Sequence, residues 1–377
     1  MKKLFSLLFA ILLVFGLVAC EQTPAPGADD ALKQQLQQII SSEFVAPKNV
    51  IVLIGDGMGP NDIILAQEHA KGVYSFGLAL NLIQNHGLAT TYSANAEITD
   101  SAASGTALAT GVKTNNGIIG KDPEGNDLQN MAEIAREAGK KIGIITDEDI
   151  CGATPSAFVL HNISRDNRAE LTNAMIRFQP DVLMSMDYNG TYALLDAEGM
   201  GLFNDTYVVA KDFRRFESAL AKDPEGEKPF WGFLDGYSSV ASDNLAQCVE
   251  IAMNRLDNEN GFFLMIESAG TDKFGHRGDI NGKLNSVVTL DRTVVAILKF
   301  MEQNPDTVLI ITSDHETGGV QLPVTGEESL RDLLTETEHT ATPVRVFGVG
   351  KGTEYFSGKT VDNTDIAKFL IAAIKGE

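Results

Sequence analysis

Cysteine is scarce in this sequence: only Cys20, Cys151 and Cys248 occur among 377 residues. Because Cys20 ends an N-terminal apolar run, two cysteines remain for the folded part of the chain. Two cysteines form one disulfide at most, which excludes a small fold organised by a disulfide framework. Their positions leave open whether Cys151 and Cys248 lie within bonding distance.

Basic residues are also few, with 30 lysines and arginines against 51 aspartates and glutamates and a net charge of −21. A surface this acidic repels nucleic-acid phosphates, so we expect no nucleic-acid-binding surface. It would also repel a small anionic molecule such as a phosphate ester. A protein that acts on such a molecule therefore needs concentrated positive charge at its site, and metal ions are the obvious source.

The N-terminal apolar run, Leu4–Val18, is too short to span a membrane comfortably. It follows two lysines and ends in Leu-Val-Ala-Cys, which resembles the bacterial lipoprotein signal. We therefore predict a signal peptide over residues 1–19 and a lipid on Cys20 that anchors an exported protein to the bacterial cell envelope, on its periplasmic or outer surface. An ordinary secretory signal with an incidental cysteine is the alternative. Residues 20–30, rich in Pro, Gly, Ala and Asp, predict a flexible tether.

The rest of the chain alternates between two patterns. Continuous apolar runs rich in β-branched residues predict buried strands at 49–54, 141–145, 262–266, 307–312 and 344–349. Helical spacing predicts helices at 31–44, 128–138, 280–301 and 365–374. This alternation predicts one α/β domain over residues 31–377, with a mostly parallel central sheet and helices on both of its faces. Residues 186–240, which contain the only tryptophan, interrupt the alternation, and we interpret them as a small cap insertion over the site.

Acidic and histidine side chains follow three of the predicted strands, where each strand ends: Asp56, Glu267, Asp272, Asp314 and His315. Ligands in open α/β sheets bind at the carboxyl ends of the strands, so segments far apart in the sequence can converge on one site. Taken alone, Asp56 is also explained as a solubilising acid in a tight glycine-rich turn.

The segment Glu267–His276 places two acids and a histidine within ten residues after a buried strand. Carboxylates at a buried strand end are costly unless they are compensated, and a metal ion supplies the compensation. The segment Ser-Asp-His-Glu-Thr-Gly-Gly at 313–319 repeats the pattern, and His339 follows in Glu-His-Thr. We interpret the remaining histidines as structural: His69, His86 and His161.

The run Thr-Asp-Ser-Ala-Ala-Ser-Gly-Thr-Ala at 99–107 places Ser101 at the predicted start of a helix. The backbone N–H groups and the positive end of a helix favour an anionic phosphate beside such a serine. A simple helix N-cap is the alternative for this residue. Downstream, the guanidinium of Arg165 can bind two phosphate oxygens with its planar fork, unless it is a solvated surface arginine.

Together and in this order, these segments resemble the alkaline phosphatase family, and the matching residues span 49 to 349. The resemblance implies two zinc ions and one magnesium ion. The first zinc would bind Asp272, His276 and His339, the second Asp56, Asp314 and His315, and the magnesium Asp56, Thr154 and Glu267. Nitrogen and oxygen ligands at the zinc sites and oxygen ligands at the third site suit these ions.

The resemblance also implies a reaction. Ser101 would be the nucleophile, Arg165 would bind the phosphate with Lys273 nearby, and small phosphate monoesters would be hydrolysed through a phosphoserine. A homodimer is a further implication of the family. A phosphodiesterase with the same metal core is the nearest rival, although Arg165 favours a terminal phosphate. The Cys-x-Pro-x-Arg motif of sulfatases is absent, and the complete residue set argues against an inactive phosphate- or metal-binding protein.

One position departs from the family pattern. Two residues before Thr154, where the family usually has an Asp or His that helps to hold the water shell of the magnesium, this chain has Gly152. In relatives with an Asp there, that residue pairs with the lysine that is Lys273 here. We therefore expect Lys273 to lack this partner and magnesium to be lost easily, unless Asp147 or Asp149 substitutes.

Overall fold

The computed structural model describes residues 27–323 and 329–377. The predicted signal peptide and Cys20 lie outside this part of the chain. Helix α1 (Ala28–Ile40) begins within the last three residues of the predicted tether, so that prediction extends too far towards the C-terminus. This helix packs Leu36 and Ile39 into the core. Within the described residues, no helix combines the length and the apolar character needed to cross a membrane.

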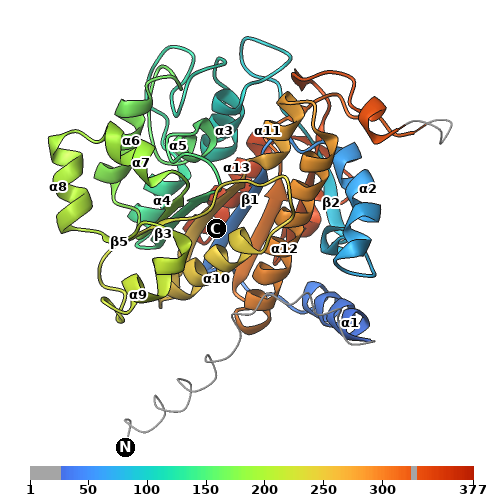
Figure 1. Ribbon diagram of the computed structural model, residues 1–377, viewed down its shortest axis with the longest axis horizontal. Coiled ribbons are helices and arrows are strands. Elements are labelled where there is room, and N and C mark those ends of the chain that lie inside the picture. Colours follow the sequence, from blue (N-terminus) through green and yellow to red (C-terminus); the bar gives the residue numbers. More distant parts are fainter. Residues whose placement is uncertain (1–26, 324–328) are drawn as a thin grey trace, which may run out of the picture.

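A large sheet forms the centre of the molecule (Figure 1). In spatial order its strands are β12 (Thr360–Asp362), β2 (Asn85–Thr90), β11 (Val344–Val349), β8 (Thr307–Thr312), β1 (Asn49–Gly55), β7 (Phe262–Ser268), β3 (Lys141–Thr146), β4 (Val182–Ser185), β6 (Phe230–Phe233) and β5 (Val208–Ala210). Among these strands β11 alone runs antiparallel to its neighbours. The prediction of a mostly parallel sheet is confirmed.

Helices cover both faces of the sheet, as predicted. Strand β1 is buried throughout and alternates its side chains between two cores, with Ile51 and Leu53 in one and Val50 and Val52 in the other. The first core is covered by α1, α2 (Pro60–His69), α9 (Phe216–Leu220), α10 (Asn244–Leu256) and α12 (Ile280–Gln303). The second is covered by α3 (Ser101–Thr110), α4 (Met131–Glu137), α6 (Arg168–Phe178), α8 (Ala197–Asp205) and α13 (Asn363–Lys375).

The interpretation of residues 186–240 as a cap needs correction. This segment holds α7 (Tyr188–Leu194), α8 and α9, and its strands β5 and β6 extend the central sheet in parallel beyond β4. Trp231 is fully buried in β6, where its ring stacks on Phe233 at 5.3 Å between centroids. The aromatic residues that interrupted the sequence pattern therefore build the core at one edge of the sheet, as their preference for strands allows.

The two cysteines of the folded part are both buried and free. Cys151 lies in the core on one side of the sheet and Cys248 in the core on the other side. A disulfide requires Cα atoms within about 7 Å of one another, and the sheet that separates the two cores prevents this.

Candidate active site

The site lies where β8, β1, β7 and β3 end, four neighbouring parallel strands at the centre of the sheet. Asp56 follows β1, Glu267 lies near the end of β7, and Asp314 and His315 follow β8. Because the carboxyl ends of parallel strands meet at the same edge, these residues converge, as the sequence predicted.

The turn that carries Asp56 requires glycine at position 57, and the side chain of Lys283 stabilises it. Gly57 has φ +70, and a Cβ there would lie 2.8 Å from the Cα of Asp272. The fully buried Lys283 donates from Nζ to the carbonyl oxygen of Gly57 at 3.1 Å and pairs with Asp62. This turn therefore brings the backbone of the Asp56 loop against the helix that carries Asp272.

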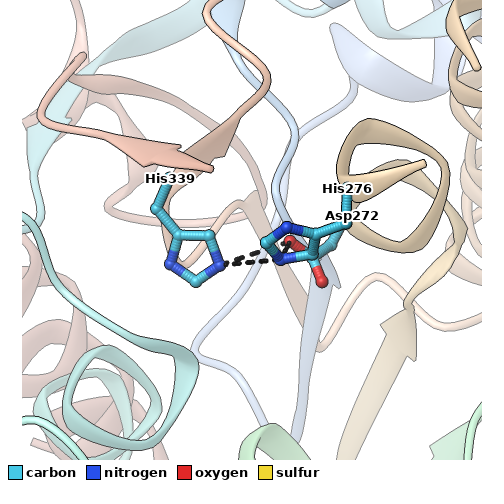
Figure 2. Close-up of side chains that lie close together, drawn as sticks. All are labelled: Asp272, His276 and His339. Carbon is cyan, nitrogen blue, oxygen red and sulfur yellow. Dashed lines mark hydrogen bonds and ion pairs between the residues drawn. The ribbon is translucent and has the colours of Figure 1, made fainter. Parts of the chain in front are cut away.

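Among the residues that the structure describes, three groups could hold a metal ion, and Asp272, His276 and His339 form the first (Figure 2). Helix α11 (Gly270–His276) presents Asp272 and His276 one turn apart, and His339 arrives from β10 (His339–Thr340), which pairs with β9 (Glu316–Thr317). The Nε2 atoms of the two histidines lie 3.2 and 3.4 Å from Asp272 Oδ1.

The Nδ1 atoms of these two histidines, which point away from Asp272, lie within hydrogen-bond distance of backbone carbonyl oxygens. His276 Nδ1 lies 2.6 Å from the carbonyl oxygen of Thr337, and His339 Nδ1 lies 2.9 Å from that of Thr99. When the Nδ1–H donates to a carbonyl, Nε2 is left with its lone pair directed at the group. Two imidazoles and a carboxylate so arranged are the ligand types that zinc prefers.

Asp56, Asp272 and His315 form the second group. His315 Nε2 lies 3.5 Å from Asp56 Oδ1 and 3.3 Å from Asp314 Oδ2, so the predicted zinc set of Asp56, Asp314 and His315 is brought together. Burial lowers the pKa of His315 to about 4, which keeps the imidazole neutral and able to bind a metal ion. Ser101 Oγ lies 3.2 Å from the same Nε2 atom.

Ser101 occupies the first turn of α3, but the N-cap is Asp100, whose side chain accepts from the N–H of Ala103 at 2.9 Å. The simple N-cap interpretation of Ser101 is therefore wrong. Asp100 also pairs with Arg165 Nη1 at 3.1 Å, and the Arg165 side chain is 33% exposed. Arg165 is thus held beside the start of α3 instead of being a free surface arginine.

The third group shares Asp56 and Glu267 with the predicted magnesium set and adds Glu148. Asp56, Glu148 and Glu267 bring carboxylate oxygens within 4.8 Å of one another. Thr154 lies in α5 (Ala153–Ala157), and its Oγ1 is buried without a hydrogen-bond partner. The sequence interpretation missed Glu148, although it lies in an acidic run directly after β3.

Lys273 lacks the expected partner at position 152, which is glycine, but a different acid takes that place. Lys273 does have an acidic partner, since its Nζ lies 3.0 Å from Glu148 Oε1. Neither suggested substitute reaches it: Asp147 accepts from the N–H of Ala269 at 2.6 Å, and Asp149 pairs with Arg168 at 2.5 Å.

The residues fit metal ions on the evidence of their own polar atoms. Three buried oxygens of the site lack any hydrogen-bond partner: Asp56 Oδ1, Asp314 Oδ2 and Thr154 Oγ1. Burial, followed by the charges of Asp272 and Asp314, raises the pKa of Asp56 well above its ordinary value. Buried polar atoms are almost always satisfied in proteins, and cations here would satisfy these oxygens and compensate the crowded carboxylates.

Thr317 and Glu316 are further residues that the sequence interpretation did not assign. Thr317 Oγ1 donates to Asp272 Oδ1 at 2.7 Å and lies 3.2 Å from His315 Nδ1. Glu316 accepts from the hydroxyl of Thr340, next to His339. Both residues follow Asp314 and His315 directly in the Asp-His-Glu-Thr motif, and this position could have identified them from the sequence. Of the histidines interpreted as structural, His69 lies 2.7 Å from Asn285 Oδ1 and His161 lies 3.0 Å from Glu133 Oε1.

Comparisons with known proteins agree with this geometry. A model of the alkaline phosphatase family matches residues 47–185 and 198–332. Alkaline phosphatase 4 of Bacillus subtilis is 30% identical over 351 residues, which cover 87% of this chain and 72% of the relative. The alkaline phosphatase of Escherichia coli is 27% identical over 407 residues, covering 87% and 86%.

Solved structures show the same fold. The alkaline phosphatase of the Antarctic bacterium TAB5 superposes with a TM-score of 0.73 at 26% identity, covering 88% of this chain and 99% of that chain. The cold-active alkaline phosphatase of Shewanella sp. superposes with a TM-score of 0.76 at 23% identity, covering 86% and 99%. Family match, fold and site together show that the chain is an enzyme of the alkaline phosphatase family, the metal-dependent phosphomonoesterases.

Proposed function

We propose that this enzyme hydrolyses small phosphate monoesters to an alcohol and inorganic phosphate through a phosphoserine on Ser101. The observation that carries the proposal is the position of Ser101 Oγ, 3.2 Å from His315 Nε2 at the start of α3. That position places a hydroxyl against the second metal group and beside the helix N-terminus, where backbone N–H groups favour a phosphate.

We propose two zinc ions and one magnesium ion as the cofactors. The ligands would be Asp272, His276 and His339 for the first zinc, Asp56, Asp314 and His315 for the second, and Asp56, Thr154 and Glu267 for magnesium. When bound, these ions supply positive charge that lowers the pKa of the serine hydroxyl and stabilises the leaving oxygen. One structure of the TAB5 enzyme, a His-to-Glu variant, is described with Mg bound in a site called M3, which supports a magnesium site in the family.

The chain's own residues perform the displacement. Ser101 Oγ gives its proton to solvent and attacks phosphorus, while the bond to the alcohol oxygen breaks on the opposite side and that oxygen takes up a proton from solvent. Water then attacks phosphorus and breaks its bond to Ser101 Oγ, which releases inorganic phosphate and leaves the serine hydroxyl protonated again. The guanidinium of Arg165, which is held in place by Asp100, binds two of the equatorial phosphate oxygens. Lys273 adds positive charge, because the carboxylates of Asp56, Glu148 and Asp272 outweigh burial and raise its pKa.

Turnover of a nitrophenyl phosphate and of its bis-ester tests the reaction class. We expect the monoester to be strongly preferred, and Arg165→Ala to lower kcat/KM for the monoester by roughly 10²-fold while affecting the bis-ester less. Arg168→Ala, which removes an arginine paired with Asp149 instead, is the control and leaves the preference intact. A bis-ester turned over as well as the monoester would identify a phosphodiesterase.

We also propose that the enzyme is exported and anchored to the cell envelope by a lipid on Cys20. Replacing Cys20 with serine removes the thiol to which the lipid is attached. We expect the wild type to partition into the detergent phase and Cys20→Ser to partition into water, because two acyl chains anchor a protein stably. Cys248→Ser, a change at a buried core thiol, is the control and remains in detergent. Wild-type protein in the aqueous phase contradicts the lipid anchor.

A further inference from the structure

Gly152 has no side chain to offer to the third metal group. The space that a side chain at this position would occupy is nevertheless filled by other atoms. A Cβ built on Gly152 would lie 3.3 Å from Glu148 Oε2 and 3.0 Å from the carbonyl oxygen of Asp149. The carboxylate of Glu148 therefore occupies the region that a side chain on residue 152 would enter from the start of α5.

Glu148 is held in this position by its backbone. Its N–H donates to Thr146 Oγ1 at 3.0 Å, and its carbonyl oxygen accepts from the N–H of Met186 at 2.9 Å. Thr146 Oγ1 in turn donates to the carboxylate of Glu267. The end of β3 thus fixes Glu148 and Glu267 through one shared hydroxyl.

The charges around Glu148 are unbalanced. Its carboxylate lies with those of Asp56 and Glu267, whereas Lys273, 3.0 Å from Glu148, is the cation paired with it. The carboxyl of Glu267 is buried, so water does little to screen the repulsion between these carboxylates. A divalent cation among oxygen ligands relieves this repulsion, and carboxylates with retained waters are the usual ligands of magnesium.

We propose that Glu148 supplies a carboxylate ligand of the third metal ion, in place of the side chain that Gly152 lacks. It then joins the metal to Lys273, whose Nζ lies 3.0 Å from Glu148 Oε1, so that magnesium binding also positions this lysine. This inference rests on the proposed magnesium site and adds a ligand from the β3 loop.

The test measures magnesium binding to the zinc-loaded enzyme by calorimetry and by the rise in melting temperature with added magnesium. We expect Glu148→Gln to weaken magnesium binding about 10–100-fold, with zinc content unchanged. Asp149→Asn, which removes an equal charge from the next residue but one that pairs with Arg168, is the matched control and keeps wild-type affinity. Wild-type magnesium affinity in Glu148→Gln would overturn the assignment.

A second pair of variants tests the shared space. Gly152→Asp in the wild type should not tighten magnesium, because its new side chain meets Glu148 and the Asp149 carbonyl. In a Glu148→Ala background the same substitution should restore most of the lost affinity. Equal effects of Gly152→Asp in both backgrounds would contradict the proposal, even if Glu148→Gln folds poorly.

The two proposals fail in different ways. If the zinc-loaded wild type binds no magnesium, the magnesium site of the proposed function fails, and the assignment of Glu148 fails with it. If the wild type binds magnesium and Glu148→Gln binds it equally well, only the assignment of Glu148 fails. Phosphate labelling of Ser101 reports on the nucleophile independently of either result.

Discussion

Ser101→Ala is expected to abolish the phosphorylated form of the enzyme and to lower kcat by roughly 10³-fold or more. The hydroxyl that lies 3.2 Å from His315 Nε2 is then gone, whereas the metal ligands and Arg165 remain. Direct attack by water accounts for the residual turnover. Acid-quenched reactions with ³²P-labelled substrate should show covalent phosphate on the wild type and none on the variant.

Ser104→Ala is the matched control for this experiment. Ser104 lies one turn further along α3, and its hydroxyl is engaged by donating to the carbonyl oxygen of Asp314 at 2.6 Å. We expect this variant to keep the covalent label. A labelled Ser101→Ala protein, with phosphate on another residue, would show that the nucleophile has been assigned incorrectly.

Removal of the metal ions is expected to abolish activity and to destabilise the fold. The carboxylates of Asp56, Asp272 and Asp314 are buried together, and without cations their mutual repulsion opposes folding. An ion present at about 1,000 times its Kd contributes about 4 kcal/mol to the free energy of unfolding, so loss of two or three ions should lower the melting temperature by roughly 10–15 °C.

Chelation followed by metal analysis, calorimetric melting and assay checks this prediction. Zinc and magnesium together should restore both the activity and the melting temperature, and a chelator already saturated with zinc should have little effect. Full activity in protein whose metal content is zero would show that the enzyme does not need metal ions.

The central strands and the long helix could be predicted from the sequence because their signals are local. The run at 307–312 is continuous, apolar and rich in β-branched residues, and it coincides with β8. The predicted helix at 280–301 agrees with α12 to within two residues at its end. Motifs directly after such strands were predictable for the same reason, since the strand direction decides where Asp56 and Asp314 lie.

Strand order and side-chain direction could not be predicted in this way. Strand β6 joins the sheet by pairing with β4, and β5 joins it by pairing with β6. These strands have only 4 and 3 residues, which is too short for a strand periodicity to be visible in the sequence. The acidic run Asp147–Asp149 follows β3, but only the path of the loop decides which carboxylate turns towards Lys273. Glu148 was missed because three consecutive acids carry the same sequence signal.

The hydrogen bond between His339 and Thr99 joins residues 240 positions apart, and the one between Gly57 and Asp314 joins residues 257 apart. A chain is synthesised from its N-terminus, so Asp56 and Ser101 exist long before His315 and His339. Neither of the two metal groups that contain these histidines can be completed on a nascent chain until its C-terminal ligands have been made. Metal capture is therefore a late step in the maturation of this enzyme, and contacts of such long range also make it a slow one.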